Sequence, residues 1–159
     1  MEDLPKCPLC EQPIAKTVLG RITGYEGGVS VTVTGLPTWA CAVRHRYFRS
    51  RKLAVWLLDT LLQESASRIP AGRESGLVFK HYRCSACEAE LPKRGAAEVV
   101  TAIDMAPEGL PPFLVEVTVP ALRCGKCGLA QARSGEELQH LVPSALVHAF
   151  HSAAIKAPG

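Results

Sequence analysis

The residues best suited to chemistry in this chain are its cysteines, and most of them come in pairs. The sequence has seven cysteines, and six of them form three Cys-x-x-Cys pairs: Cys7 with Cys10, Cys84 with Cys87, and Cys124 with Cys127. Such a pair supplies two of the four tetrahedral ligands of a zinc ion, because its backbone amides fold back towards both sulfurs. The second and third pairs therefore predict one complete four-cysteine zinc centre.

The seventh cysteine, Cys41, has no cysteine partner three positions away, but His45 follows it four positions later. An imidazole is longer than a thiol, so a cysteine and a histidine at this spacing can both reach one metal ion. The predicted first site has the ligands Cys7, Cys10, Cys41 and His45. Two alternatives stay open. In the first, His81 takes the place of His45 as a ligand; in the second, the Cys-x-x-Cys pairs are exchanged between the two sites.

The stretches around these pairs repeat along the chain. One copy runs from CPLC to VSVTVTGLPTWAC, and the other runs from CSAC to FLVEVTVPALRC. Alternating β-branched residues predict a strand with one buried face in each copy. Residues 17–22 and 96–103 are the expected hairpin partners of these strands, and residues 23–28 are the expected first turn.

A helical pattern follows each copy. Residues 49–66 place leucines on one broad face, and this helix is expected to stop near Pro70. Ser134 and Glu137 predict a capping box at the start of a second helix. Pro143 is expected to kink that helix or to make it restart, because proline lacks the N–H that the helix needs.

Together these elements predict an α+β fold of two small zinc-ribbon-like β modules, each followed by a helix. The modules are residues 1–66 and 77–159, and residues 67–76 form a linker that is rich in Pro, Gly and Ser. Modules of this size bury too little apolar area to fold unaided. We therefore expect two zinc ions per chain to act as staples.

Residues 5–48 resemble the zinc-binding domain of the YgiT/MqsA-type antitoxins, and residues 82–130 resemble it more weakly. CPLC, the alternating strand and GLPTWAC carry the resemblance. It implies that Cys7, Cys10 and Cys41 are zinc ligands, while His45 stands where that family has a cysteine. The helix-turn-helix that often follows this domain is not evident in the sequence, so the resemblance implies a zinc module only, and antitoxin or repressor activity does not carry over from it.

Positive charge gathers in the middle of the chain. The formal net charge is +3, and residues 41–83 carry 9 basic and 3 acidic side chains. The densest part follows the first predicted site and contains Arg44, Arg46, Tyr47, Phe48, Arg49, Arg51 and Lys52. Such a segment can contact phosphates and stack its aromatic rings on bases. The alternative is a solvated helix face whose cations pair with acidic residues. Two zinc ions on seven thiolates would bring the net charge of the chain to zero, and this neutral balance favours the solvated face over nucleic-acid binding.

The composition, 47% apolar and 21% charged, is that of a folded protein. No apolar run approaches the roughly 20 residues of a membrane span, and the first residues are acidic rather than signal-like. We expect a cytoplasmic protein without membrane contacts, in which cysteines stay reduced. The predicted function is a non-enzymatic protein-interaction or regulatory module with two structural zinc sites. The alternatives are a nucleic-acid-binding regulator, and redox or hydrolytic chemistry at an incompletely coordinated first site.

Overall fold

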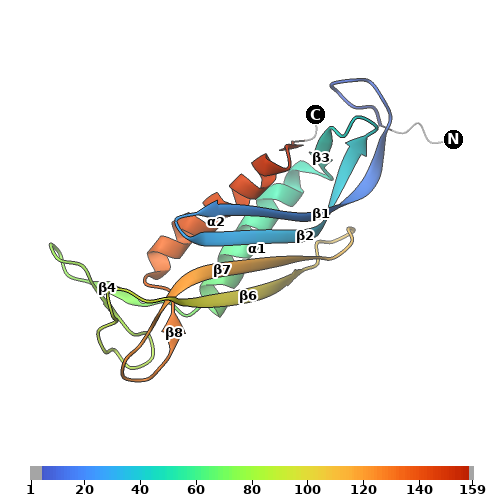
Figure 1. Cartoon of the computed structure of the whole chain (residues 1–159). Coiled ribbons are helices and arrows are strands. Elements are labelled where there is room, and N and C mark those ends of the chain that lie inside the picture. Colours follow the sequence, from blue (N-terminus) through green and yellow to red (C-terminus); the bar gives the residue numbers. More distant parts are fainter. Residues whose placement is uncertain (1–4, 158–159) are drawn as a thin grey trace.

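The computed structural model describes residues 5–157, so the outermost residues of the two predicted modules, 1–4 and 158–159, lie outside the described residues. The predicted α+β class is confirmed (Figure 1). In chain order the elements are β1 (Ile14–Glu26), β2 (Val29–Cys41), β3 (Arg46–Phe48), α1 (Arg51–Arg68), β4 (Arg73–Ser75), β5 (His81–Arg83), β6 (Ala97–Met105), β7 (Phe113–Arg123), β8 (Ala130–Gln131), α2 (Gly135–Ser152) and β9 (Ile155–Lys156).

Two long antiparallel hairpins form the centre of the sheet. β1 pairs with β2 over their whole length, and β6 pairs with β7 in the same way. The predicted strands and their hairpin partners are therefore confirmed. The turn predicted at residues 23–28 is shorter in the structure, because residues 23–26 pair within β1 and only Gly27 and Gly28 lie between the two strands. Period-two alternation causes this arrangement, because it gives each hairpin one apolar face and one polar face.

The two hairpins join edge to edge. β2 and β7 are antiparallel neighbours, with Val31 opposite Val117 and Val33 opposite Val115, and all four valines are 0% exposed. The predicted modules thus meet in one seven-stranded sheet, to which β3, β8 and β9 add short strands. A single two-stranded hairpin is marginally stable in water, so sharing one sheet buries an apolar face that neither hairpin could cover alone.

Both helices cover the same face of this sheet (Figure 1). Leu57 and Leu61 of α1 and Val142 and Leu146 of α2 belong to one cluster of buried side chains with the strand valines. α2 crosses β1 very closely, since a Cβ atom on Gly24 would collide with the backbone of Ala145 and Ala149. Within the described part of the chain, neither helix is long and apolar enough to cross a bilayer.

The start of α2 agrees in part with the predicted capping box. The Ser134 hydroxyl accepts the backbone N–H of Glu137 at 3.4 Å, as expected. The Glu137 carboxylate does not return to Ser134 but accepts two hydrogen bonds from Arg133, at 2.6 and 3.0 Å. A charged bidentate pair is stronger than a neutral backbone contact, which explains the exchange of partners.

The predicted restart of α2 at Pro143 is wrong, because the helix continues from Gly135 to Ser152 with Pro143 inside it. Pro143 leaves the carbonyl of Gln139 without its helical partner. Gln139 is exposed, so water can satisfy that carbonyl. Val142 and Leu146, on either side of the proline, are both fully buried, so the helix packs against the core both before and after Pro143.

The predicted linker at residues 67–76 contains regular secondary structure and a buried residue. α1 extends to Arg68, Ile69 is buried, and β4 pairs with β5 as a separate two-stranded sheet. We call residues 73–83 the arm. Figure 1 shows the arm projecting from the end of the molecule where β8 lies.

Candidate metal centres

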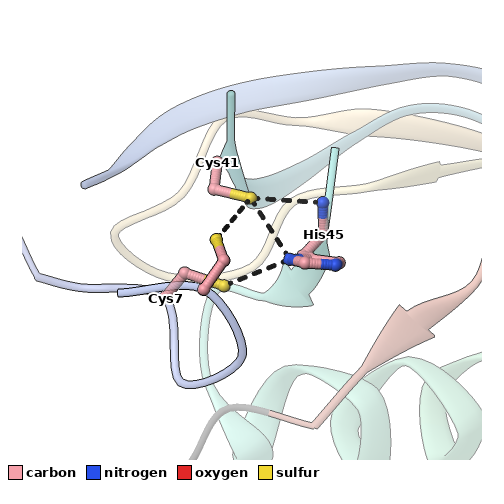
Figure 2. A group of neighbouring side chains, drawn as sticks. Cys7, Cys41 and His45 are labelled. Carbon is pink, nitrogen blue, oxygen red and sulfur yellow. Dashed lines mark hydrogen bonds between the residues drawn. The ribbon is translucent and has the colours of Figure 1, made fainter. Parts of the chain in front are cut away.

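The four predicted ligands of the first site come together at one end of β2. Cys7 and Cys10 precede β1, Cys41 ends β2, and His45 precedes β3, and their ligand atoms all lie within 4.8 Å of one another. His45 presents Nδ1, which is 3.4 Å from Sγ of Cys7 and 3.5 Å from Sγ of Cys41. Figure 2 shows these three side chains pointing towards a common centre.

The second site has the same plan at the β8 end of the sheet. Cys84 and Cys87 precede the hairpin of β6 and β7, and Cys124 and Cys127 follow it. Sγ of Cys84 lies 3.5 Å from Sγ of Cys127, and Sγ of Cys87 lies 3.5 Å from Sγ of Cys124. All four sulfurs lie within 4.8 Å of one another.

These separations fit a metal ion and exclude disulfides. A tetrahedral zinc ion with Zn–S bonds of about 2.3 Å holds its sulfurs roughly 3.8 Å apart, whereas a disulfide bond is about 2.05 Å long. Sγ of Cys10 lies 3.7 Å from Sγ of Cys41, and none of the seven cysteines forms a disulfide. The pairs do not exchange between sites, and Nδ1 of His81 lies 2.8 Å from a carboxylate oxygen of Glu90 instead of at a metal site.

Three of the four ligand turns have identical hydrogen bonds. In each Cys-x-x-Cys turn the carbonyl of the first cysteine accepts the N–H of the residue four positions later, namely Glu11, Glu88 or Gly128. These three residues have φ angles of 58°, 64° and 78°, a left-handed conformation that reverses the chain. The repetition shows that one local geometry builds both sites.

The fourth turn is one residue shorter. The carbonyl of Cys41 accepts the N–H of Arg44, only three positions later, and Arg44 is the residue with a positive φ, 66°. His45 therefore lies after the turn, directly before β3, and a cysteine side chain at this position would not reach the other three ligands. The imidazole Nδ1 is one bond further from Cα than a cysteine Sγ, which makes up the difference.

Hydrogen bonds stabilise the thiolate form of selected cysteines. Burial alone would raise the pKa of Cys7, but the Tyr47 hydroxyl and the backbone N–H groups of Leu9 and Cys10 lower it to about 6. The Gln131 side chain outweighs burial and lowers the pKa of Cys84 to about 6. A lowered pKa favours metal binding, because the thiolate is the ligand.

At the second site the protonated form of Cys127 is favoured, because its pKa is raised. The backbone N–H of Leu129 opposes the shift, but hydrogen bonding with Cys84, burial and the neighbouring thiols raise the pKa of Cys127 to about 11. Backbone N–H groups of Cys127 and Lys126 lower the pKa of Cys124. A divalent cation at the centre of the four sulfurs would replace the proton that Cys127 otherwise holds.

Tyr47 supports the first site and is not a surface residue. Its hydroxyl lies 3.2 Å from Sγ of Cys7, and the side chain is only 4% exposed. The hydrogen bond with Cys7 and burial raise the pKa of Tyr47 to about 12, so the hydroxyl keeps its proton and can donate a hydrogen bond to the thiolate. The expectation that Tyr47 could stack on a base is therefore wrong, because its ring is needed in the core.

Gln131 plays the corresponding part at the second site and was not expected from the sequence. Its Nε2 donates to Sγ of Cys84 at 3.1 Å and to the carbonyl of Leu129 at 3.4 Å. Its Oε1 accepts the N–H of Ser85 at 2.9 Å. The side chain is 0% exposed, so Gln131 connects the two ligand turns of the second site inside the protein.

The basic segment after the first site is divided between the core and the surface. Arg46 donates to the carbonyl of Ala153 at 3.2 Å, and the Arg49 guanidinium lies 4.7 Å from the ring centroid of Trp39. Phe48 is buried against Phe150. The side chains of Arg44, Arg51 and Lys52 are exposed. Cations reach the surface here, but neither Tyr47 nor Phe48 accompanies them.

Replacing Gln131 with leucine should weaken metal binding at the second site by about 10–100-fold, the usual cost of losing a hydrogen-bond partner of a ligand. Leucine keeps the size of the side chain but leaves the N–H of Ser85 and the thiolate of Cys84 without their partner. Competition with a chromophoric chelator measures the affinity of both sites. Tyr47→Phe is the matched variant and should affect the first site only; equal losses at both sites would contradict this assignment.

No family model matches the chain, and neither a curated protein nor a solved structure is similar to it.

Proposed function

We propose that the protein holds two structural zinc ions and acts as a non-enzymatic module that engages another protein. The closed geometry of the two ligand sets carries the first part of this proposal. Each set offers four protein ligands within 4.8 Å, so a tetrahedral ion there has no position left for water or substrate. Three thiolates with an imidazole, or four thiolates, are donor sets that suit zinc.

Catalysis at the first site would require His45 to leave the metal. The separations of 3.4 and 3.5 Å between its Nδ1 and two sulfurs support coordination instead. The resemblance of residues 5–48 to the antitoxin zinc-binding domain supports the same structural role, and it rests on the residues that build this site. We carry over the zinc module only, not the partners of that family.

The tip of the arm supports the proposed contact with a protein. Leu77, Val78 and Phe79 are consecutive and are 104%, 82% and 79% exposed. Water-exposed runs of large apolar side chains are unfavourable for a monomer, and they mark interaction sites. The second metal site begins where the arm ends, since Cys84 directly follows β5 in the chain. A metal ion there would hold the base of the arm in place.

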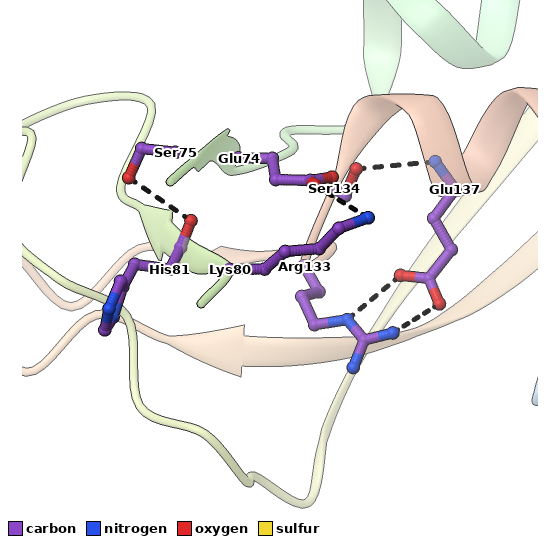
Figure 3. A network of polar contacts seen from close by, with 7 residues as sticks. All are labelled: Glu74, Ser75, Lys80, His81, Arg133, Ser134 and Glu137. Atoms are coloured by element: carbon purple, nitrogen blue, oxygen red, sulfur yellow. Dashed lines mark hydrogen bonds and ion pairs between the residues drawn. The ribbon is translucent and has the colours of Figure 1, made fainter. Parts of the chain in front are cut away.

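The charges beside the tip favour a protein partner over an anionic one. Lys80 lies 2.9 Å from Glu74, Arg73 lies 3.8 Å from Glu88, and His81 lies 2.8 Å from Glu90. Figure 3 shows the pair of Glu74 and Lys80 across the arm. Phosphate-rich surfaces of nucleic acids or membranes attract unpaired cations, and these are paired. An apolar pocket on another protein suits this tip best.

A photo-crosslinking amino acid, p-benzoylphenylalanine, in place of Phe79 tests this contact in cells that produce the protein. We expect a defined set of crosslinked proteins, identified by mass spectrometry. The set should disappear when Leu77 and Val78 are changed to serine, while the melting temperature stays nearly the same, because exposed side chains contribute little to stability. The same amino acid at Val100, which is 62% exposed on β6, is the control. Equal labelling from both positions would contradict the proposal.

A further inference from the structure

A cavity of about 470 Å³ lies between the start of α2, the end of β7 and the loop before β6. Its size is within the range of pockets that hold small organic ligands, roughly 300–1,000 Å³. It belongs to neither metal site, and the proposed zinc function does not use it.

The wall of the cavity is apolar. Val29, Val119, Leu138 and Leu141 line it, and the first three are buried members of the core, between 0% and 7% exposed. A core residue at the bottom of an open cavity is rigid, because its other sides are packed. The accessible apolar surface of the cavity belongs to Pro120, which is exposed, and Leu141, which is half-buried, and the buried residues hold this surface in place for the body of a ligand.

The rim of the cavity is cationic. Lys93 and Arg94 lie there with exposed side chains, and neither makes an ion pair or a side-chain hydrogen bond within residues 5–157. The other two charges at the cavity, Arg133 and Glu137, neutralise each other at 2.6 Å (Figure 3). The cavity thus has two unpaired positive charges beside an apolar wall.

We propose that this cavity binds a small amphipathic anion, a carboxylate carried on an apolar body. The body would cover Pro120 and Leu141, and the carboxylate would accept charge-assisted hydrogen bonds from Lys93 and Arg94. The anion does not depend on the N-terminus of α2. Ser134 already accepts the N–H of Glu137 at that helix end, and the Glu137 carboxylate is paired with Arg133, so recognition comes from the two side chains and the wall.

Isothermal titration of the purified full-length protein with sodium octanoate tests this proposal, with octylammonium chloride as the cation of equal length. Octanoate should bind at one site per chain, and octylammonium at least about tenfold more weakly, because charged hydrogen bonds are worth about that factor. Lys93→Gln with Arg94→Gln should weaken octanoate by about tenfold or more. Lys16→Gln with Lys52→Gln removes the same charge from exposed positions outside the cavity and should change the affinity less than about twofold.

Backbone NMR shifts locate the bound octanoate. The largest changes should fall on the amides of Gly27, Gly95 and Leu141, which line the cavity. Absence of binding at millimolar octanoate would overturn the proposal. Equal affinity for octanoate and octylammonium, an unchanged affinity of the Lys93 and Arg94 variant, or shifts located elsewhere would overturn it as well. The metal content of the protein plays no part in these outcomes, so they are independent of the proposed zinc function.

Discussion

Cys84→Ser should release one of two zinc ions and strongly destabilise the end of the protein that carries the arm. Cys84 is 0% exposed, and its sulfur accepts the hydrogen bond of Gln131, so serine removes a ligand at the most enclosed corner of the second site. Structural zinc contributes about 10–16 kcal/mol in zinc-finger peptides, and we expect the loss of this ligand to cost at least about 3 kcal/mol of unfolding free energy.

Thermal unfolding followed by circular dichroism measures this effect. In a protein of this size 1 kcal/mol shifts the melting temperature by about 2–4 °C, so the decrease should be at least about 6 °C. Ser85→Ala, at the next residue, keeps all four ligands and serves as the control. A Cys84→Ser protein that retains two zinc ions and the melting temperature of the parent would show that the second cluster is not a metal site.

His45→Ala should weaken metal binding at the first site by more than about 100-fold, which exceeds the 10–100-fold cost of losing a partner of a ligand. The reason is that His45 is the ligand that closes the shorter turn, and three thiolates would remain. His45→Cys restores a fourth thiolate, but its sulfur is one bond shorter than Nδ1. We therefore expect an affinity between those of the alanine variant and the parent.

Cobalt substitution distinguishes these outcomes, because the visible absorption of Co²⁺ reports the number of thiolate ligands and the geometry of the site. His45→Ala should change the spectrum of one ion and leave that of the other unchanged. His81→Ala is the matched control, since His81 pairs with Glu90 and lies outside both ligand sets. An unchanged affinity and spectrum in His45→Ala would remove His45 from the first site.

The ligand sets and the hairpins were predictable because local rules determine them. The three Cys-x-x-Cys pairs of this chain all fold into the same local turn, and alternation in VSVTVT and FLVEVTV defines the buried face of β2 and β7. His45 could be predicted from the repeat, although its reason, a turn that is one residue shorter, appears only in the backbone hydrogen bonds.

The rest depends on contacts between distant segments, which carry no local pattern. Nothing in the alternation of β2 indicates that β7 is its neighbour. Gln131 and Tyr47 are single polar residues without a motif. Gln131 contacts the sulfur of Cys84, 47 residues away, and Tyr47 contacts the sulfur of Cys7, 40 residues away. Gln131 carried no sequence signal, and Tyr47 stood within a basic segment, which suggested a nucleic-acid-binding surface instead.

The metal content of the protein, purified without added zinc and measured by plasma mass spectrometry, tests the central claim most directly. Two closed ligand sets predict two zinc ions per chain, one lost in Cys84→Ser and the other weakened in His45→Ala. A parent protein that contains one zinc ion or none, while remaining folded, would contradict the account of two structural zinc sites.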